Sequence, residues 1–158
     1  MRSMAPLDPI DARILLALDD DPDAAVLGLA RTLGLARNTV HARLRRMAGD
    51  GTLRGYAVRV DPAALGYPLV AFVLLSISQA GGDEVIAQLA QLAQVVEIHA
   101  VSGEADLLVK VVARTTADLL AVTGRMVGIE GVVRSNTAVS LVESMPIRMR
   151  PLLAVAAD

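Results

Sequence analysis

Several residue types that often build chemical sites are scarce or absent in this chain. The sequence has no cysteine and no tryptophan, and its two histidines, His41 and His99, lie far apart. The lack of cysteine excludes disulfides and thiolate metal sites, and two distant histidines do not make a metal-binding motif. We therefore expect no metal and no cofactor.

Long apolar runs are also missing. The longest, residues 69–77, is too short to cross a bilayer, and the first residues contain no apolar stretch of the signal-peptide type. We expect a cytoplasmic protein with no membrane partner.

What the chain does contain is enough apolar residues for a core and an uneven distribution of charge. The 158 residues are 54% hydrophobic with a net charge of −2, which allows one domain or two small ones. Residues 1–28 carry six aspartates and two arginines, whereas residues 36–59 carry six arginines and a single acid. Because the composition changes after this basic stretch, we predict a first domain over residues 1–60, a hinge over 61–66 and a second domain over 67–158.

The first domain is predicted to contain three helices. Asp8, Pro9 and Asp11 are typical of a helix start: an N-cap acceptor, proline at the first helical position and a carboxylate near the positive helix end. A run of aspartates ends this helix. The second and third helices are expected over residues 25–33 and about 37–48.

Ala30, Gly34 and Val40 have the spacing of a helix-turn-helix. The small residue lets the helices approach, glycine accepts the turn, and the branched residue fixes the second helix against the first. Val40, Leu44 and Met47 form the apolar side of the third helix, so its polar side can enter the major groove of double-stranded DNA.

Polar and basic residues of this region are candidates for DNA contact. Residues 52–60 are predicted to form the strands of a small wing, with Arg54 placed for a backbone or minor-groove contact. Arg43, at the margin of the apolar stripe, is predicted instead to pair with an acid of the first helix. The alternative for the whole face is an ordinary solvated surface. The candidate DNA-binding residues are Arg37, Asn38, Thr39, His41, Ala42, Arg45, Arg46 and Arg54.

The second domain alternates in the order strand, helix, strand, strand, helix, strand. These elements are expected at residues 68–77, 83–93, 95–103, 105–113, 115–127 and 131–142. The fold is therefore predicted to be α+β, an N-terminal winged helix-turn-helix domain plus a C-terminal ferredoxin-like βαββαβ domain with both helices on one face. The first strand lacks clean polar alternation, so we expect burial on both sides, with a second subunit covering the free face in a homodimer. His99 is expected on an interior strand, as a hydrogen-bonded core or interface histidine.

Three parts of the chain follow one known pattern. LDPIDARILLALDDD, then LARTLGLARNTVHARLRRM with GTLRGYAVRVDPAALG, and then EIHAVSGEADLLVKV occur in order between about Leu7 and Glu143. They are similar to the opening helix, the helix-turn-helix with wing and hinge, and the effector-domain signature of the Lrp/AsnC, or feast/famine, family. This resemblance implies a sequence-specific transcription regulator that is not an enzyme, forms homodimers that often assemble into tetramers or octamers, and commonly senses an amino acid or related small metabolite between subunits.

The resemblance also implies an effector pocket at the turn between the middle strands and on the last strand. Carboxylates there would bind the ammonium of a zwitterion, and hydroxyl or backbone N–H groups its carboxylate. Ala105 replaces the aromatic residue usual in the family, which leaves the pocket wider. The alternative is a plain hairpin turn whose acids face water. The implied effector-binding residues are Val101, Ser102, Gly103, Glu104, Asp106, Asn136 and Thr137.

Other interpretations stay open. Sirohaem decarboxylases share this two-domain architecture, so His99 could act near a tetrapyrrole, although residues 67–147 offer few basic side chains for its carboxylates. An architectural DNA-binding protein that ignores metabolites is a further alternative. Residues 148–158 could form an edge strand, a domain-swap contact or a loose tail. Ala25 and Ala36 stand where the family usually has polar helix caps, each worth roughly 1 kcal/mol.

Overall fold

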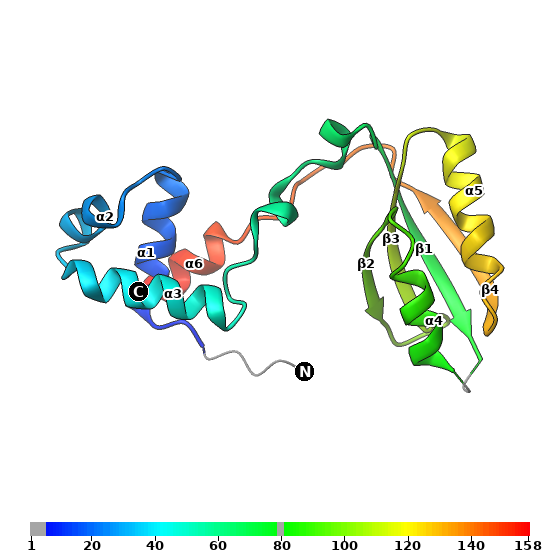
Figure 1. Cartoon of the computed structure of the whole chain (residues 1–158), viewed down its shortest axis with the longest axis horizontal. Coiled ribbons are helices and arrows are strands. Elements are labelled where there is room, and N and C mark those ends of the chain that lie inside the picture. Colours follow the sequence, from blue (N-terminus) through cyan, green and yellow to red (C-terminus); the bar gives the residue numbers. More distant parts are fainter. Residues whose placement is uncertain (1–5, 79–80) are drawn as a thin grey trace. The chain divides into compact units, whose positions relative to one another are not determined.

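The computed structural model describes residues 6–78 and 81–158, which form two compact units (Figure 1). The helical unit contains the described residues up to Arg59 together with Met145–Asp158. The sheet unit contains the described residues of Val60–Ser144. The C-terminal segment, which we expected in the second domain, therefore belongs to the helical unit.

Three helices build most of the helical unit and confirm the prediction from the sequence. They are α1 Pro9–Asp20, α2 Val26–Leu33 and α3 Arg37–Gly49. A capping box begins α1: the Asp8 carboxylate accepts the N–H of Asp11 at 2.8 Å, and the Asp11 carboxylate accepts the N–H of Asp8 at 3.2 Å. The buried core between the helices consists of Ile14, Leu29, Ala30, Val40 and Met47.

The turn between α2 and α3 has the expected conformation. Gly34 ends α2 with φ of +66°, a region that glycine adopts without strain, and its N–H donates to the Ala30 carbonyl. Ala30 and Val40 are both buried, as the helix-turn-helix spacing requires. As predicted, Ala25 and Ala36 give their helices no side-chain cap.

The described residues 52–60 form no strands, so the prediction of a wing built from strands is wrong for the single chain. The Asp50 carboxylate accepts the N–H of Thr52 at 2.9 Å and closes a tight turn. The chain then continues into two short 3-10 helices, η1 Tyr56–Arg59 and η2 Pro62–Leu65. A two-stranded hairpin is marginal by itself in water, and short acidic side chains favour local bonds to the backbone instead.

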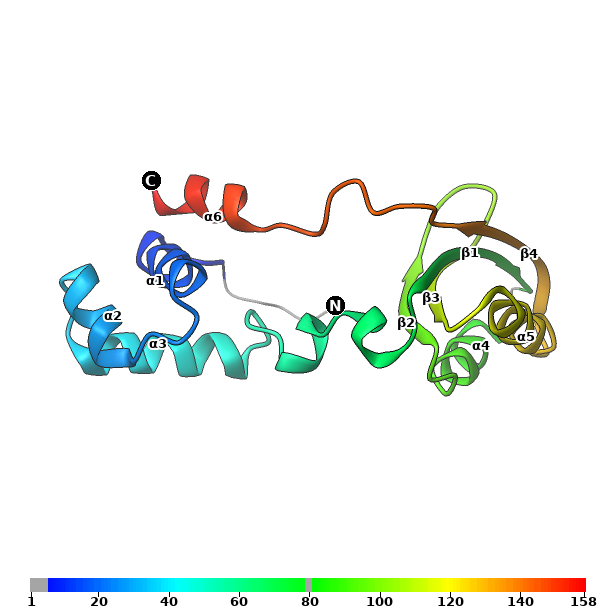
Figure 2. The ribbon, with the colours of Figure 1, turned by 90° about the horizontal axis from the view of Figure 1, so that it is seen from above.

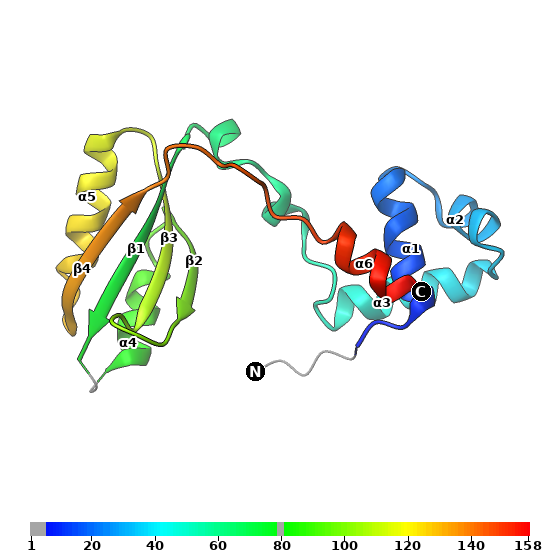
Figure 3. The ribbon, with the colours of Figure 1, turned by 180° about the vertical axis from the view of Figure 1, so that it is seen from behind.

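The C-terminal segment forms a helix, α6 Arg150–Ala157, which lies beside α1 (Figure 3). The Arg150 guanidinium bonds the carboxylates of Asp19 and Asp20, each at 2.8 Å. Pro151 suits the first helical turn, and the leucine- and alanine-rich sequence that follows favours a helix. The edge strand and the loose tail considered for this segment are therefore wrong.

The sheet unit confirms the predicted ferredoxin-like order. Its elements are β1 Leu69–Ile77, α4 Gly82–Leu89, β2 Val95–Ala100, β3 Leu107–Ala113, α5 Thr116–Val127 and β4 Val132–Val139. The strand order is β2-β3-β1-β4, and every pairing is antiparallel. Both helices lie on the same face of the sheet (Figure 2).

The two faces of β1 differ in burial. Ala71, Val73 and Leu75 are fully buried toward α4 and α5. On the opposite face, the residue exposures of Phe72 and Leu74 are 39% and 41%. In a single chain, β1 is thus buried on one side, and the burial on both sides that we predicted requires a partner.

His99 departs from the expectation of an interior strand. It lies on β2, an edge strand, and its side chain is exposed. Its Nε2 atom is 2.8 Å from a carboxylate oxygen of Glu97, two positions away on the same strand face. In the single chain, His99 is a surface residue rather than a core one.

Candidate nucleic-acid interface and effector pocket

The outward face of α3 holds every DNA-binding candidate except Arg54. Thr39 is half-buried and the other candidates on this helix are exposed. Arg54 is exposed in the loop that follows α3 and precedes η1. The amphipathic pattern of α3 therefore leaves most of its polar side chains exposed, as the sequence predicted.

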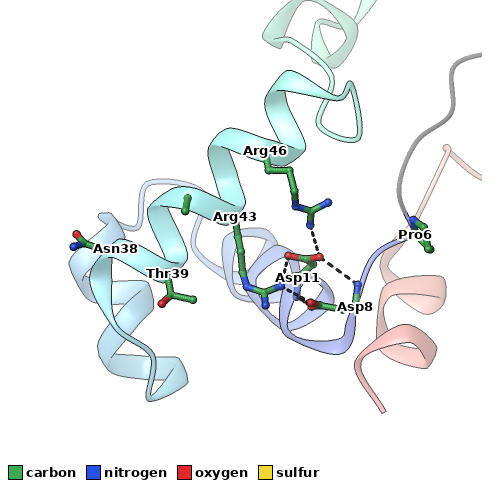
Figure 4. Close-up of a pocket in the computed structure, with 8 residues that line it drawn as sticks. Pro6, Asp8, Asp11, Asn38, Thr39, Arg43 and Arg46 are labelled. Carbon is green, nitrogen blue, oxygen red and sulfur yellow. Dashed lines mark hydrogen bonds and ion pairs between the residues drawn. The ribbon is translucent and has the colours of Figure 1, made fainter.

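Two arginines of α3, Arg43 and Arg46, form ion pairs that hold this helix against α1 (Figure 4). The Arg43 Nη1 atom bonds the carboxylates of Asp8 at 2.5 Å and Asp11 at 2.8 Å, which confirms the predicted ion pair with the first helix. Arg46 bonds the same Asp11 carboxylate and also lies 3.4 Å from that of Asp50. Asp11 is only 1% exposed. We call Asp8, Asp11, Arg43 and Arg46 the Asp11 cluster.

The electrostatics of the Asp11 cluster stabilise its charged state. The Arg43 guanidinium lowers the pKa of Asp8, with help from the Asp11 N–H. Burial alone would raise the pKa of Asp11, but hydrogen bonds from Arg43, the Asp8 N–H and Arg46 outweigh it, and the pKa is lowered. The same contacts raise the pKa of Arg43. Each carboxylate is therefore ionised at neutral pH and able to anchor α3.

The arginines of α3 consequently fall into two groups. Arg43 and Arg46 reach toward α1 in the Asp11 cluster, whereas Arg37 and Arg45 are exposed and form no ion pair with any residue that the structure describes. The cluster borders an open hollow of about 650 Å³ that Asn38 and Thr39 also line. In Figure 4, Asn38 points away from the cluster, whereas Thr39 projects from the same side of α3 as Arg43. A DNA contact by Arg46 stays a prediction. To make this contact, the Arg46 guanidinium would have to bond DNA and the Asp11 carboxylate at the same time.

A second hollow lies on the sheet face that the helices leave uncovered. This candidate effector pocket, of about 140 Å³, is lined by residues from β1, from the turn between β2 and β3, and from β4. It brings together two residues that the family resemblance implied, Glu104 and Asn136. Its other lining residues are Leu74, Ser76, Ala105, Arg134 and Ser135.

Hydrogen bonds fix the turn over residues 102–106 against the end of β1. The Asp106 N–H donates to the Leu75 carbonyl and the Asp106 carboxylate accepts the Ile77 N–H, at 2.9 and 2.8 Å. Gly103 has φ of +124°, which favours glycine at the tip. Asp106 thus has a structural role, and one of its carboxylate oxygens is already engaged.

The remaining residues that the family resemblance implied do not line the pocket. Asn136 pairs with Leu74 on the uncovered face, whereas Thr137 pairs with the buried Val73 and so directs its side chain to the helix-covered side. Val101, directly before the turn over residues 102–106, and Ser102 and Gly103 within it do not line the pocket. Glu104 and Asn136 are therefore the implied residues that the pocket gathers.

Neither a metal-binding cluster nor a membrane-spanning helix is found in the described part of the chain. Residues 6–78 and 81–158 contain no group of histidine, cysteine or acidic residues that could hold a metal ion. Within the same residues, no helix is both long and apolar enough to cross a membrane.

Comparison with known proteins decides the family. Residues 7–48 match the AsnC-type helix-turn-helix domain, and residues 70–148 match the Lrp/AsnC ligand binding domain. The chain belongs to the Lrp/AsnC family. It is a transcriptional regulator of the Lrp/AsnC type, as the sequence predicted.

Individual relatives and structures agree with this assignment. The HTH-type transcriptional regulator FL11 of Pyrococcus horikoshii is 33% identical over 129 residues, 80% of this chain and 85% of the relative. The HTH-type transcriptional regulator AldR of Mycolicibacterium smegmatis is 38% identical over 116 residues, 72% of this chain and 68% of the relative. E. coli AsnC has a TM-score of 0.80 at 25% identity, covering 93% of this chain and 100% of AsnC. The feast or famine regulatory protein of M. tuberculosis, complexed with L-methionine, has a TM-score of 0.78 at 28% identity, covering 90% and 97%.

Sequence reasoning about this Lrp/AsnC regulator missed several pocket residues, above all Arg134, Ser76 and Leu74. Ser76 lies opposite Arg134 in the pairing of β1 with β4, two residues along from the pair of Leu74 with Asn136 and on the same face. The two-residue period of a strand could have placed Arg134 on the face of Asn136. The register with β1 could not be read from the sequence, because it depends on the folded sheet.

Proposed function

We propose that the outward face of α3 binds double-stranded DNA in the major groove. The observation that carries this proposal is the division of the arginines: Arg43 is used for packing against α1, while Arg37 and Arg45 stay exposed without an ion pair among the described residues. Asn38 and His41 are exposed on the same helix and supply donors and acceptors for base edges. Arg54 is assigned to a phosphate contact, which orients the helix without reading sequence.

The salt dependence of DNA affinity tests this proposal. A duplex of arbitrary sequence suffices, because the electrostatic part of binding does not depend on sequence. We expect log affinity to fall with log salt, by a slope of about 0.9 for each phosphate neutralised. Arg45→Ala should lower both the affinity and the slope, whereas Arg125→Ala on α5 of the sheet unit should change neither. A flat salt dependence contradicts the proposed face.

Arg46→Ala is a poorer test of DNA contact, although Arg46 belongs to the proposed face. Its guanidinium bonds the buried carboxylate of Asp11, so its removal also takes a partner from the Asp11 cluster. We expect Arg46→Ala to weaken both DNA binding and the folding of the helical unit. The thermal midpoint of this variant must be measured beside its affinity to separate the two effects.

We further propose that a second copy of the chain covers the open face of the sheet. Partly exposed Phe72 and Leu74 on this face support a homodimer, which would also supply two recognition helices for two DNA half-sites. Light scattering after gel filtration should show a dimer, or a tetramer or octamer built from dimers. Leu74→Asp is expected to dissociate it, and Leu141→Asp, at an exposed position outside the sheet, is the control.

The effector pocket is proposed to bind an amino acid or a related small metabolite. It combines an apolar floor, Leu74, with the carboxylate of Glu104 and the amide of Asn136, groups that suit a zwitterion. The relative from M. tuberculosis that was solved with L-methionine supports the same ligand class. A thermal-shift panel of the standard amino acids tests it: a ligand should raise the unfolding midpoint and alter DNA affinity. If none does, the chain is better described as an architectural DNA-binding protein.

We propose that the protein works without catalysis, in the cytoplasm. The relatives compared above carry regulator names, which supports a regulatory rather than an enzymatic role. Adding sirohaem to the purified protein tests the decarboxylase alternative. A shifted Soret band with His99 dependence would contradict our proposal.

A further inference from the structure

Arg134 lines the effector pocket. Neither the sequence patterns nor the proposed function gives this residue a role. It sits on β4 opposite Ser76 of β1, on the uncovered face of the sheet. Its Nη2 atom donates to the Glu104 carbonyl at 3.0 Å, and the Ser76 hydroxyl donates to the same carbonyl at 3.3 Å. These two bonds connect the turn over residues 102–106 to the central strand β1 and to the edge strand β4, and they hold the guanidinium at the pocket.

The charge of Arg134 is not neutralised within the described chain. A guanidinium offers five N–H donors, and the one bond to the Glu104 carbonyl leaves most of them available. Arg43, Arg46 and Arg150 each pair with aspartates, whereas Arg134 forms no ion pair with any residue that the structure describes. The pocket therefore contains a positive charge that forms no ion pair with a carboxylate of the described chain.

The neighbours of Arg134 suit an anion more than a second cation. Asn136 is two residues along β4 on the same face, and its amide adds further donors. Leu74, opposite Asn136, supplies an apolar floor that limits competition from water. A carboxylate matches a guanidinium in geometry, because two parallel N–H groups can bond its two oxygens.

We propose that Arg134, assisted by Asn136, binds a carboxylate group of the effector and so determines which ligands the regulator accepts. This inference rests on the proposed effector function and names the ligand group that the pocket reads. Glu104 at the rim would then face the positive end of a zwitterion. A ligand without a carboxylate, such as an amine or an amide, is expected to bind more weakly, because it cannot form the charge-assisted pair of hydrogen bonds with Arg134.

The carboxylate can come from two sources, which different probes distinguish. If Arg134 binds the α-carboxylate, the wild-type protein should bind L-methionine better than L-methioninamide. If it binds a side-chain carboxylate, L-glutamate should bind better than L-glutamine. Isothermal titration of the 158-residue protein with these four compounds measures both preferences.

Substitution of Arg134 tests the assignment directly. We expect Arg134→Gln to weaken binding of the preferred ligand by about tenfold or more and to abolish its preference over the amide, because a charge-assisted hydrogen bond is lost. Arg134→Lys keeps the charge but loses the planar pair of donors, so an intermediate affinity is expected. Asn136→Asp preserves the side-chain shape and offers Arg134 a competing carboxylate, so it should also abolish the preference.

Controls separate this inference from the proposed function. Arg125→Gln, whose arginine on α5 bonds Gln94 at 3.2 Å, should leave every affinity unchanged. If no amino acid of the thermal-shift panel binds the wild-type protein, both proposals are overturned. If an amino acid binds but its carboxylate form is not preferred over the matching amide, the role of Arg134 alone is overturned. Binding to the wild type with the same preference kept in Arg134→Gln or Asn136→Asp overturns the role of Arg134 alone.

Discussion

The helical unit and the sheet unit are stabilised by different means. In the sheet unit, twelve buried apolar residues form one core between the sheet and its two helices. The helical unit has a core of five buried apolar residues, and beside it Asp11, the one buried charged residue among those described. The smaller core is supplemented by the ion pairs of the Asp11 cluster, which join the start of α1 to the middle of α3.

This difference explains why arginine content alone does not define a DNA-binding face. In the helical unit the same residue type performs two tasks on one helix: Arg43 packs α3 against α1, while Arg45 faces solvent. A helix that must present cations to DNA is anchored through carboxylates on its neighbour, so its orientation depends on charge. The sheet unit, which is proposed to carry the effector, has no such dependence in its core. The following experiments test this contrast.

Leu75→Ala in the sheet core should have the largest effect. Leu75 is fully buried under α4 and α5, so its truncation should lower the free energy of unfolding of the sheet unit by about 3 kcal/mol. Hydrogen exchange with mass spectrometry, which reports each unit separately, measures the loss. Leu141→Ala, at a position 95% exposed, is the control. An equal loss at both positions would contradict the assignment of the core.

Asp11→Asn should have the next largest effect, confined to the helical unit. The change keeps the shape of the side chain but removes the charge that holds Arg43 and Arg46, so we expect a loss of about 2 kcal/mol. The same exchange experiment should find the sheet unit unaffected. Asp23→Asn, at an exposed position before α2, should be neutral. A neutral Asp11→Asn would mean that the cluster adds nothing to the small core.

Acid should weaken the helical unit by the same mechanism. The pKa values of Asp8 and Asp11 are lowered in the folded chain from 3.8, so their stabilisation is complete above about pH 5 and is lost as the pH falls through the folded values. Unfolding of the helical unit, followed by hydrogen exchange corrected for its intrinsic rate, should therefore become easier below about pH 4. In Asp11→Asn this acid dependence should shrink to the share of Asp8 and of Asp50, whose pKa is lowered by its hydrogen bonds with Thr52. An acid dependence that is unchanged in the variant would assign it to other groups.

The sequence predicted those features that depend on local chemistry or on a strong period. Asp8 and Asp11 indicated the start of α1, Gly34 indicated the turn, and the stripe through Val40 and Met47 indicated which side of α3 is buried. Arg43 could be predicted as an ion-pair partner because it stands at the edge of that stripe. These inferences needed no knowledge of how distant segments pair.

The features that the sequence did not predict depend on contacts between distant residues. The register of β4 against β1 brings Arg134 opposite Ser76, and a shift of one residue would have placed it on the other face. The ion pair between Asp11 and Arg46 could not be predicted, because it depends on how close α1 and α3 lie in the folded chain. The wing residues have a strand-like composition, but the turn bond of Asp50 and the lack of a partner strand gave 3-10 helices instead.

The attachment of α6 should show the smallest effect of charge. The side chains of Arg150, Asp19 and Asp20 are each more than half exposed, at 51%, 55% and 65%, so water and salt screen their attraction. Arg150→Gln should barely change the hydrogen exchange of α6, whereas Leu153→Ala should speed it up, because Leu153 is half-buried on the helix that lies beside α1. If Arg150→Gln instead released α6 at low salt but not at high salt, exposed ion pairs would be holding an element of this unit in place. If Arg150→Gln has only the small effect that we expect, charge stabilises the helical unit chiefly where a carboxylate is buried, at Asp11. The C-terminal helix is then held as the sheet is, by apolar contacts.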